Sequence, residues 1–542
     1  MLWFQSFSLK IKTFLDSYYQ PKYFVIFLIR FLILLLFISS TYTFIGRGDY
    51  ANYSNVARNL VQGKGFTVDY LAWHYIQYPQ VSHAEDMWPL LQPVWIAFSF
   101  FLFGVSPFAA RIPNAIFFTL LILIIYFIGT KLFNSKIGFW AAILTSFNIN
   151  LLKYSTDWIT SDVALAVMSL IIFYLGYQLL LESTRKHLSL GKVFFFGLIA
   201  GLAVLQKPMG ILLPSVYVPF VLYFYRRDLN KLFKPTLVFL IAILIPVGPF
   251  FIRNMILFGT LFLPIEHYLG YQIKYFPYET IFSIQYGHPP TLKTWFDYGW
   301  VNFLRINWQY FRYSVDTFVY KDLLMPYTVI VLSLLGLRNL KDQRKFFFYP
   351  LVLLFVIMST LMATYWHYES RYYAMLIPIF NLLAVICFFE LFPKVNWKNA
   401  TLVVILIFIT FLPSLKAVLE GVKPKVDDPA LIAYTWIKNN TSENSVIMTL
   451  TPWELNFHSE RQAIVIPNED KNQILWMAKK YNSDYLELEF LTEVKRQSLK
   501  DLYLGRGTQE FIPLYLDGNR IYIYKINWEK VNLDPNTKPY WY

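Results

Sequence analysis

Apolar segments long enough to cross a membrane recur along most of this chain. A spanning helix needs about 20 mostly apolar residues, and roughly eleven segments before residue 422 approach that length. The candidate spans cover residues 23–45, 108–130, 137–153, 162–181, 193–206, 209–225, 235–257, 322–337, 346–364, 372–392 and 400–418. The sequence therefore predicts an α-helical polytopic membrane protein, with a transmembrane region over residues 1–421 and a small carboxy-terminal domain over residues 422–542.

Composition supports this class and argues against a nucleic-acid-binding protein. Hydrophobic residues make up 56% of the chain and charged residues only 15%, whereas soluble domains carry about 25% charged residues. The net charge of +14 would suit nucleic acid, but the basic residues fall in short loops between spans, as in other membrane proteins. We therefore expect a lipid bilayer as a partner and no nucleic acid. The single cysteine, Cys387, lies in an apolar run and can form no intrachain disulfide.

The distribution of basic loops predicts the orientation. Lysine and arginine concentrate in cytoplasmic loops, and every loop of one alternating set is short and basic: Lys10, Lys12 and Lys22; Lys131 and Lys136; Arg185, Lys186 and Lys192; Arg226, Arg227, Lys231 and Lys234; Arg338, Lys341, Arg344 and Lys345; Lys394 and Lys398. We therefore expect the protein to lie in the inner cell membrane with its amino terminus in the cytoplasm. No signal-peptide cleavage pattern is present, so the first span should remain as an anchor.

The other set of loops is expected outside the cytoplasm. It contains two long polar segments, residues 46–107 and 258–321, and the carboxy-terminal domain. In that domain DPALIAYTWIKNN has helical spacing, and SVIMTL and AIVIP are typical of short buried strands. Asp517-Gly518 between alternating apolar runs indicates a hairpin. The pattern predicts a small extracytoplasmic α/β domain.

Ionisable residues stand at the outer ends of several spans. Such residues are costly inside a membrane protein and are candidates for function, although each could simply anchor its helix at the interface. They come from four separate turns that should meet on one face, namely Asp49; Asp157 and Asp162; Lys207; and Glu369 with Arg371.

Motifs around these positions resemble the GT-C glycosyltransferases that use polyprenyl-phosphate sugars, such as the protein O-mannosyltransferases and the lipid A aminoarabinose transferases. The motifs occur in the expected order over most of the membrane region: Asp49 to Tyr53, Ala57-Arg58 and Gly63; Leu102-Phe103-Gly104 and Ala109 to Pro113; Ser161-Asp162; Lys207-Pro208; Arg253-Asn254 with Phe258-Gly259; and Arg371-Tyr372 with Leu376 to Pro378. Tyr50 stands where many relatives carry a glutamate, so Asp49 is the only acid of that pair.

The resemblance implies transfer of a sugar from a lipid phosphate to a lipid, glycan or protein acceptor, with inversion, at the outer membrane surface. Lys207 and Arg371 would bind the donor phosphate, since arginine binds phosphate strongly and in a bidentate manner. Asp49 would act as general base on an acceptor hydroxyl, and Asp162 would position the acceptor or a metal. Asp157, Glu369 and Arg58 are further candidates, and Asp157 could instead pair with Lys153.

The first long outer segment holds other candidates. His83, Glu85 and Asp86 have the chemistry of ligands for a divalent metal ion, although charged side chains in a solvated loop are the simpler interpretation. The segment is also rich in tyrosine and tryptophan, which favour the membrane interface and also stack on sugars. We expect interfacial helices there.

Two other functions remain open from the sequence. A lipid or polysaccharide transporter or flippase would carry charged or broken helices near the membrane midplane, whereas the charges here gather at one face. A non-catalytic scaffold with a sugar-binding outer domain is the other alternative. Loss of transfer on replacing Asp49 with asparagine would separate the enzyme from both.

Overall fold

The structure is a computed structural model, and it describes most of the chain. The described residues are 21–275, 282–283, 293–297, 299–316, 325–338, 340, 344–364, 369–393, 412, 415–416, 419, 429–489, 496–517 and 521–538.

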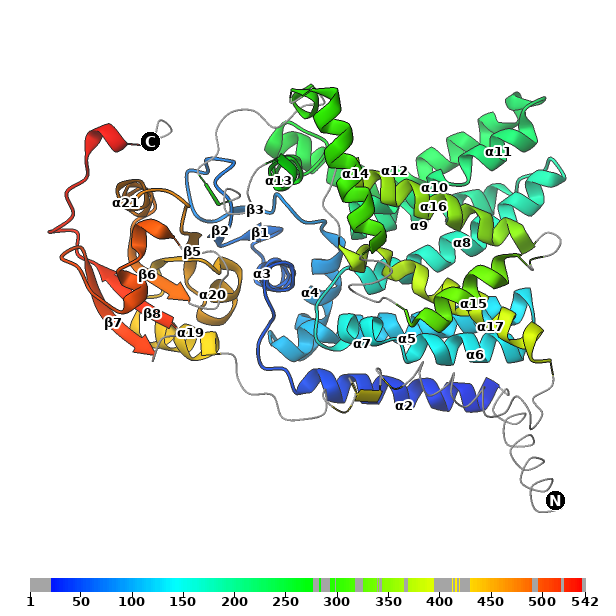
Figure 1. Cartoon of the computed structure of the whole chain (residues 1–542), viewed down its shortest axis with the longest axis horizontal. Helices are drawn as coiled ribbons and strands as arrows, with labels where there is room; N and C mark the ends of the chain where they lie inside the picture. Colours follow the sequence, from blue (N-terminus) through cyan, green and yellow to red (C-terminus); the bar gives the residue numbers. More distant parts are fainter. Residues whose placement is uncertain are drawn as a thin grey trace, which may run out of the picture.

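Apolar helices form the larger part of the molecule and lie side by side (Figure 1). Six described segments are long and apolar enough to cross a membrane: α2 (Pro21–Ser40); α5 (Pro107–Leu132); α8 (Asp162–Thr184); η1, α10 and α11 (Pro208–Tyr225); η2 and α12 (Leu229–Phe258); and η7 with α17 (Ser370–Leu391). Shorter apolar helices are α4 (Leu91–Phe103), α9 (Leu190–Gln206), α15 (Tyr327–Arg338) and α16 (Lys345–Thr364). The α-helical membrane class expected from the sequence is confirmed.

The prediction of one continuous membrane-spanning helix is wrong for one segment. Residues 137–153 form two helices, α6 (Ser135–Ser146) and α7 (Ile149–Thr156). The break comes at Asn148, whose side-chain oxygen accepts hydrogen bonds from the backbone N–H groups of Asn150 and Leu151 at 3.1 and 3.0 Å. Asparagine is a preferred residue at such a helix start. The expected span at 400–418 lies almost entirely outside the described residues, so the number of about eleven spans stays a prediction.

Glycines allow the membrane helices to approach one another closely. A Cβ on Gly129 of α5 would lie 2.7 Å from the Cα of Gly138 in α6. A Cβ on Gly176 of α8 would lie 2.3 Å from the ring of Tyr217. Because lipid tails are as apolar as the helices, close packing of this kind is what holds membrane helices together.

The first outer segment, residues 46–107, is more ordered than its polar composition suggested. It contains α3 (Asp49–Val61), the short strands β1 (Thr67–Val68), β2 (Tyr70–Leu71) and β3 (His83–Ala84), and α4. The second outer segment contains α13 (Pro264–Tyr275) and α14 (Trp300–Asp316).

The carboxy-terminal region is the predicted α/β domain. Its helices and strands are α19 (Pro429–Asn440), β4 (Val446–Thr449), α20 (Pro452–Ser459), β5 (Gln462–Val465), α21 (Lys471–Lys480), β6 (Ser483–Glu489), β7 (Phe511–Asp517) and β8 (Ile521–Ile526). The helix at 429–440, the strands at 446–449 and 462–465, and the antiparallel pairing of β7 with β8 were all expected.

One strand of this sheet comes from the first outer segment. The order of the sheet is β2-β5-β4-β6-β8-β7, and β2 pairs in parallel with β5 through Tyr70 and Ala463. The helix α3 lies between the carboxy-terminal sheet and the bundle of apolar helices, and α20 packs against it (Figure 1). The outer segment and the carboxy-terminal domain therefore fold together.

Candidate active site

Asp49 is the first residue of α3. The preceding residue, Gly48, has φ +58° and ψ −116°, a conformation that favours glycine. At the start of a helix a carboxylate is stabilised by the helix dipole. The Oδ2 atom of Asp49 accepts a hydrogen bond from Nη2 of Arg371 at 2.5 Å, so that residues more than 300 positions apart meet here.

Arg371 lies in η7 (Ser370–Leu376), at the end of the bundle from which α17 starts. Its Nε atom donates to Glu369, so the guanidinium contacts two carboxylates. The Arg371 side chain is only 13% exposed, whereas Asp49 and Glu369 are 24% and 32% exposed. A guanidinium held by two carboxylates is fixed in position, and the carboxylates themselves are partly accessible.

A second ion pair joins the ends of two other helices. Lys207 follows α9 in an extended conformation, and its Nζ atom lies 2.5 Å from Oδ1 of Asp162, the first residue of α8. The Asp162 side chain is 2% exposed. Its second oxygen, Oδ2, has no hydrogen-bond partner among the described residues. A buried polar atom of this kind is costly unless something else pairs with it.

The ring of Tyr372 connects the two ion pairs. The Lys207 ammonium lies 4.1 Å from its centroid and the Arg371 guanidinium 5.8 Å. The five residues Asp49, Asp162, Lys207, Glu369 and Arg371 are called the charge cluster below. It contains two cations within reach of an anion and carboxylates beside them, an arrangement that suits a phosphate leaving group and a proton acceptor.

Tyr50, the residue that replaces the second acid, does not supply another carboxylate. Its ring stacks on that of Trp158, with the centroids 5.7 Å apart. Burial raises the pKa of the Tyr50 phenol well above its usual range, so it stays neutral beside the charge cluster.

Comparison with known proteins identifies this architecture. The family model described as dolichyl-phosphate-mannose-protein mannosyltransferase matches residues 88–252. The structure of ArnT from Cupriavidus metallidurans bound to undecaprenyl phosphate is similar, with a TM-score of 0.60 and 14% identity over 93% of this chain and 98% of that one. The protein has the GT-C fold.

A second GT-C structure supports the same conclusion. The oligosaccharyltransferase of Archaeoglobus fulgidus, in a complex with Zn and sulfate, matches with a TM-score of 0.56 and 12% identity over 93% of this chain and 74% of that one. No curated protein sequence matches the chain significantly. The resemblance to GT-C proteins read from the motifs is thus confirmed.

Two sequence candidates lie outside the charge cluster. Asp157 ends α7, and its backbone carbonyl accepts a hydrogen bond from Nε of Arg111 at 3.1 Å. Arg58 is buried and donates to the carbonyls of Asn456 and Phe457 and to the Asn456 side chain, at 2.7–3.2 Å. Arg58 therefore attaches α3 to α20.

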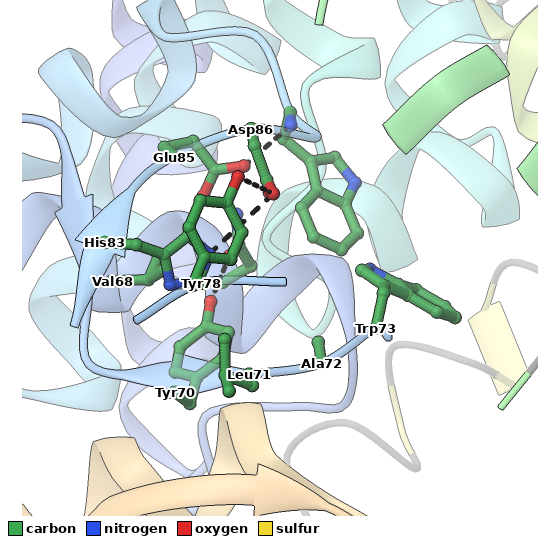
Figure 2. Close-up of a pocket in the computed structure, with 11 residues that line it drawn as sticks. Val68, Tyr70, Leu71, Ala72, Trp73, Tyr78, His83, Glu85 and Asp86 are labelled. Atoms are coloured by element: carbon green, nitrogen blue, oxygen red, sulfur yellow. Dashed lines mark hydrogen bonds and ion pairs between the residues drawn. The ribbon is translucent and has the colours of Figure 1, made fainter. Parts of the chain in front are cut away.

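His83, Glu85 and Asp86 also lie apart from the cluster, beside a small hollow that is partly open to solvent (Figure 2). The Tyr78 ring stacks on His83, with the centroids 4.0 Å apart, and its hydroxyl donates to Asp86 at 2.7 Å. Burial raises the pKa of Asp86 to about 7, and burial beside Asp86 also raises the pKa of Glu85.

Backbone N–H groups hold one carboxylate of this acidic group. Glu85 accepts hydrogen bonds from the backbone N–H groups of Met87 and Trp88 at 2.9 and 2.8 Å. Within the part of the chain that the structure describes, no three His, Cys, Asp or Glu side chains are arranged as metal ligands. The simpler interpretation from the sequence, charged side chains in a solvated loop, is wrong for Glu85 and Asp86, because both are buried.

The sequence analysis assigned no role to three residues that hold the outer segments around the site, namely Arg47, Gly48 and Arg253. Arg47 and Gly48, directly before Asp49, bond to Glu489 and Glu454 of the carboxy-terminal domain. Arg253 donates to the backbone carbonyls of Glu85 and Phe66, at 2.7 and 3.3 Å. Two glycines flanking an arginine in Gly46-Arg47-Gly48 were the available signal for a turn there.

Proposed function

We propose that the protein is an integral-membrane glycosyltransferase that transfers a sugar from a polyprenyl-phosphate donor to a hydroxyl of a lipid, glycan or protein acceptor. The observation that carries the proposal is the charge cluster, in which the cations of Lys207 and Arg371 lie over the ring of Tyr372 and Arg371 pairs with the carboxylate of Asp49. Support for a lipid-phosphate donor comes from the ArnT structure, which is bound to undecaprenyl phosphate.

Lys207 and Arg371 would hold the donor phosphate. Negative charge grows on this phosphate as the bond from the anomeric carbon to its oxygen breaks, and fixed cations stabilise such charge most strongly where water is excluded. Arg371 can share its N–H groups between a phosphate and the carboxylates that orient it, because a guanidinium carries five donors. The polyprenyl phosphate leaves with the bonding electron pair.

Asp49 would act as the general base. It would accept the proton of the acceptor hydroxyl while that oxygen forms the new bond to the anomeric carbon. A single displacement from the face opposite the phosphate inverts the anomeric configuration. Asp162 would orient Lys207 and, through its unpaired Oδ2 atom, a hydroxyl of a substrate.

The site would face the outside of the inner membrane. The basic loops place the amino terminus in the cytoplasm, and Asp49, Lys207 and Arg371 then lie at the outer ends of their helices with the carboxy-terminal domain. A transporter or flippase would not need a base at this position.

Mass spectrometry of envelope glycolipids and glycoproteins tests the function. Cells with the gene should contain a product that is one sugar heavier than in cells without it, and the gene carrying Asp49→Asn should not restore that product. An unchanged envelope with and without the gene would contradict the transferase. A product restored fully by Asp49→Asn would contradict the role of Asp49.

A further inference from the structure

The three residues before Asp49 form a tight turn. Gly46 and Gly48 both have positive φ, +99° and +58°. A Cβ on Gly48 would meet nothing within 4 Å, so its backbone conformation, and not lack of space, requires glycine there. Gly48 has no side chain that could cap α3, and its backbone carbonyl accepts the N–H of Asn52 at 2.9 Å.

The carboxy-terminal domain holds the turn from the other side. Arg47 makes two parallel hydrogen bonds to Glu489, from Nη2 to Oε1 at 2.6 Å and from Nη1 to Oε2 at 3.0 Å. The Glu489 side chain is fully buried at the end of β6. Such bidentate pairs fix direction as well as distance, so the strand end determines where Arg47 lies.

A second carboxyl group bonds to the residue next to Asp49. The Oε1 atom of Glu454, in the first turn of α20, accepts the backbone N–H of Gly48 at 2.8 Å. Glu454 is buried, and its Oε2 atom has no hydrogen-bond partner among the described residues. A buried glutamate is costly unless it is hydrogen-bonded, and the Gly48 N–H satisfies one of its two oxygens.

The body of α3 is held by the same domain. The side-chain amide of Asn55 donates to the carbonyl of Trp453 at 2.8 Å, one residue before Glu454. Arg58 donates to Asn456 and Phe457 one turn further along. The start and the middle of α3 are therefore bonded to successive residues of α20.

We propose that Glu454 and Glu489 are positioning residues that hold Asp49 at the attack geometry, so that docking of the carboxy-terminal domain sets the rate of transfer. The inference rests on the function proposed above, with Asp49 as the base. Glu489 bonds to Arg47 and Glu454 bonds to Gly48, so both glutamates act on Asp49 through the residues before it. A displacement of about 1 Å at a reacting group can lower a rate about 100-fold.

The test compares variants of the full-length chain that remove or keep the hydrogen bonds between the turn before Asp49 and the carboxy-terminal domain. Glu454→Ala and Arg47→Ala remove one contact each, whereas Glu454→Gln keeps an amide oxygen that can accept the Gly48 N–H. Lys471→Ala is the matched control, since it breaks the 2.8 Å ion pair with Glu510 on the same domain without contacting α3. Arg47 is 39% exposed, so its replacement should not prevent folding.

We expect Glu454→Ala and Arg47→Ala to form about 10- to 100-fold less glycosylated product, with the affinity for undecaprenyl phosphate within threefold of the wild type. Glu454→Gln and Lys471→Ala should keep near-normal product. Hydrogen exchange of the backbone amides from Arg47 to Asn52 should accelerate in the first two variants only. A merely structural role would lower folding and lipid binding together.

The outcomes separate this inference from the proposed function. If wild-type cells make no product, the function fails, and the exchange rates alone decide whether the carboxy-terminal domain orders the turn. If the wild type is active but Glu454→Ala and Arg47→Ala keep full transfer or unchanged exchange, the positioning role is wrong.

Discussion

Removing the positive charge of Lys207 should destabilise the protein, and removing Asp162 as well should restore its stability. The two side chains are 14% and 2% exposed and lie 2.5 Å apart. Breaking a buried ion pair by removing one partner typically costs about 3–5 kcal/mol, because the other charge is left buried without compensation. For Lys207→Met we expect a loss of about 3 kcal/mol, since Asp162 already has one oxygen without a partner.

The double variant Lys207→Met/Asp162→Leu should behave differently. Replacing both members of a buried pair by apolar groups of similar size is often neutral or stabilising. We expect its stability to lie within about 1 kcal/mol of the wild type. Its transfer activity should nevertheless be lost, because the donor phosphate would have lost one of its two cations.

Thermal unfolding in detergent, at one heating rate for all variants, measures the first effect, and product formation measures the second. Lys192→Met is the control, because its 2.6 Å pair with Glu182 is 40% and 21% exposed and should contribute only about 0–1 kcal/mol. A double variant that unfolds as early as Lys207→Met would refute the ion-pair explanation of stability. A double variant with normal transfer would refute phosphate binding by Lys207.

Three further predictions concern other parts of the molecule. Gly48→Ala should lose about 1–2 kcal/mol of stability through its positive φ and should lower transfer. Gly191→Ala, where the added Cβ also meets nothing within 4 Å, lies in the helix α9 and should lower neither stability nor transfer. Thermal unfolding and product formation measure both variants. Burial raises the pKa of Glu454 from 4.5 to about 7, so the folded state binds this proton more tightly than the unfolded state. The free energy of unfolding should therefore fall by about 3 kcal/mol as the pH rises from 4.5 to 7. In Glu454→Gln this pH dependence should be absent, and the same dependence in both proteins would contradict the burial of Glu454. In a cysteine-free background, Ser442→Cys should react with a membrane-impermeant maleimide on intact cells and Arg185→Cys should not, and the reverse result would invert the proposed orientation.

Much of the architecture could be predicted from the sequence because hydrophobicity over about 20 residues reports directly on membrane spans. The carboxy-terminal domain was also predictable, since strand and hairpin patterns are local. The break at Asn148 was not, because the capping property of a single polar residue is hidden inside an apolar run. The strand β2 was missed for a different reason: two residues carry no periodicity, and their partner Ala463 lies almost 400 positions away.

The candidate site, like the fold, could be predicted from the sequence only in part. Asp49, Asp162, Lys207 and Arg371 could be named because a charge at the end of a span is rare. Their pairing, Asp49 with Arg371 and Lys207 with Asp162, depends on how helices pack and could not be read from the sequence. The contribution of Glu454 and Glu489 was hidden as well, because acids in a soluble domain are common and only their burial singles them out.

The measurement that tests the central claim most directly is the release of free polyprenyl phosphate by the purified protein. Polyprenyl-phosphate sugars extracted from the membranes of the producing cells would serve as donors, with the envelope extract as acceptor. The wild type should release polyprenyl phosphate in step with the glycosylated product. Asp49→Asn should bind undecaprenyl phosphate normally but release the lipid at least about 100-fold more slowly, as expected for loss of a general base. Equal rates for the two proteins, or no release by the wild type, would contradict the account.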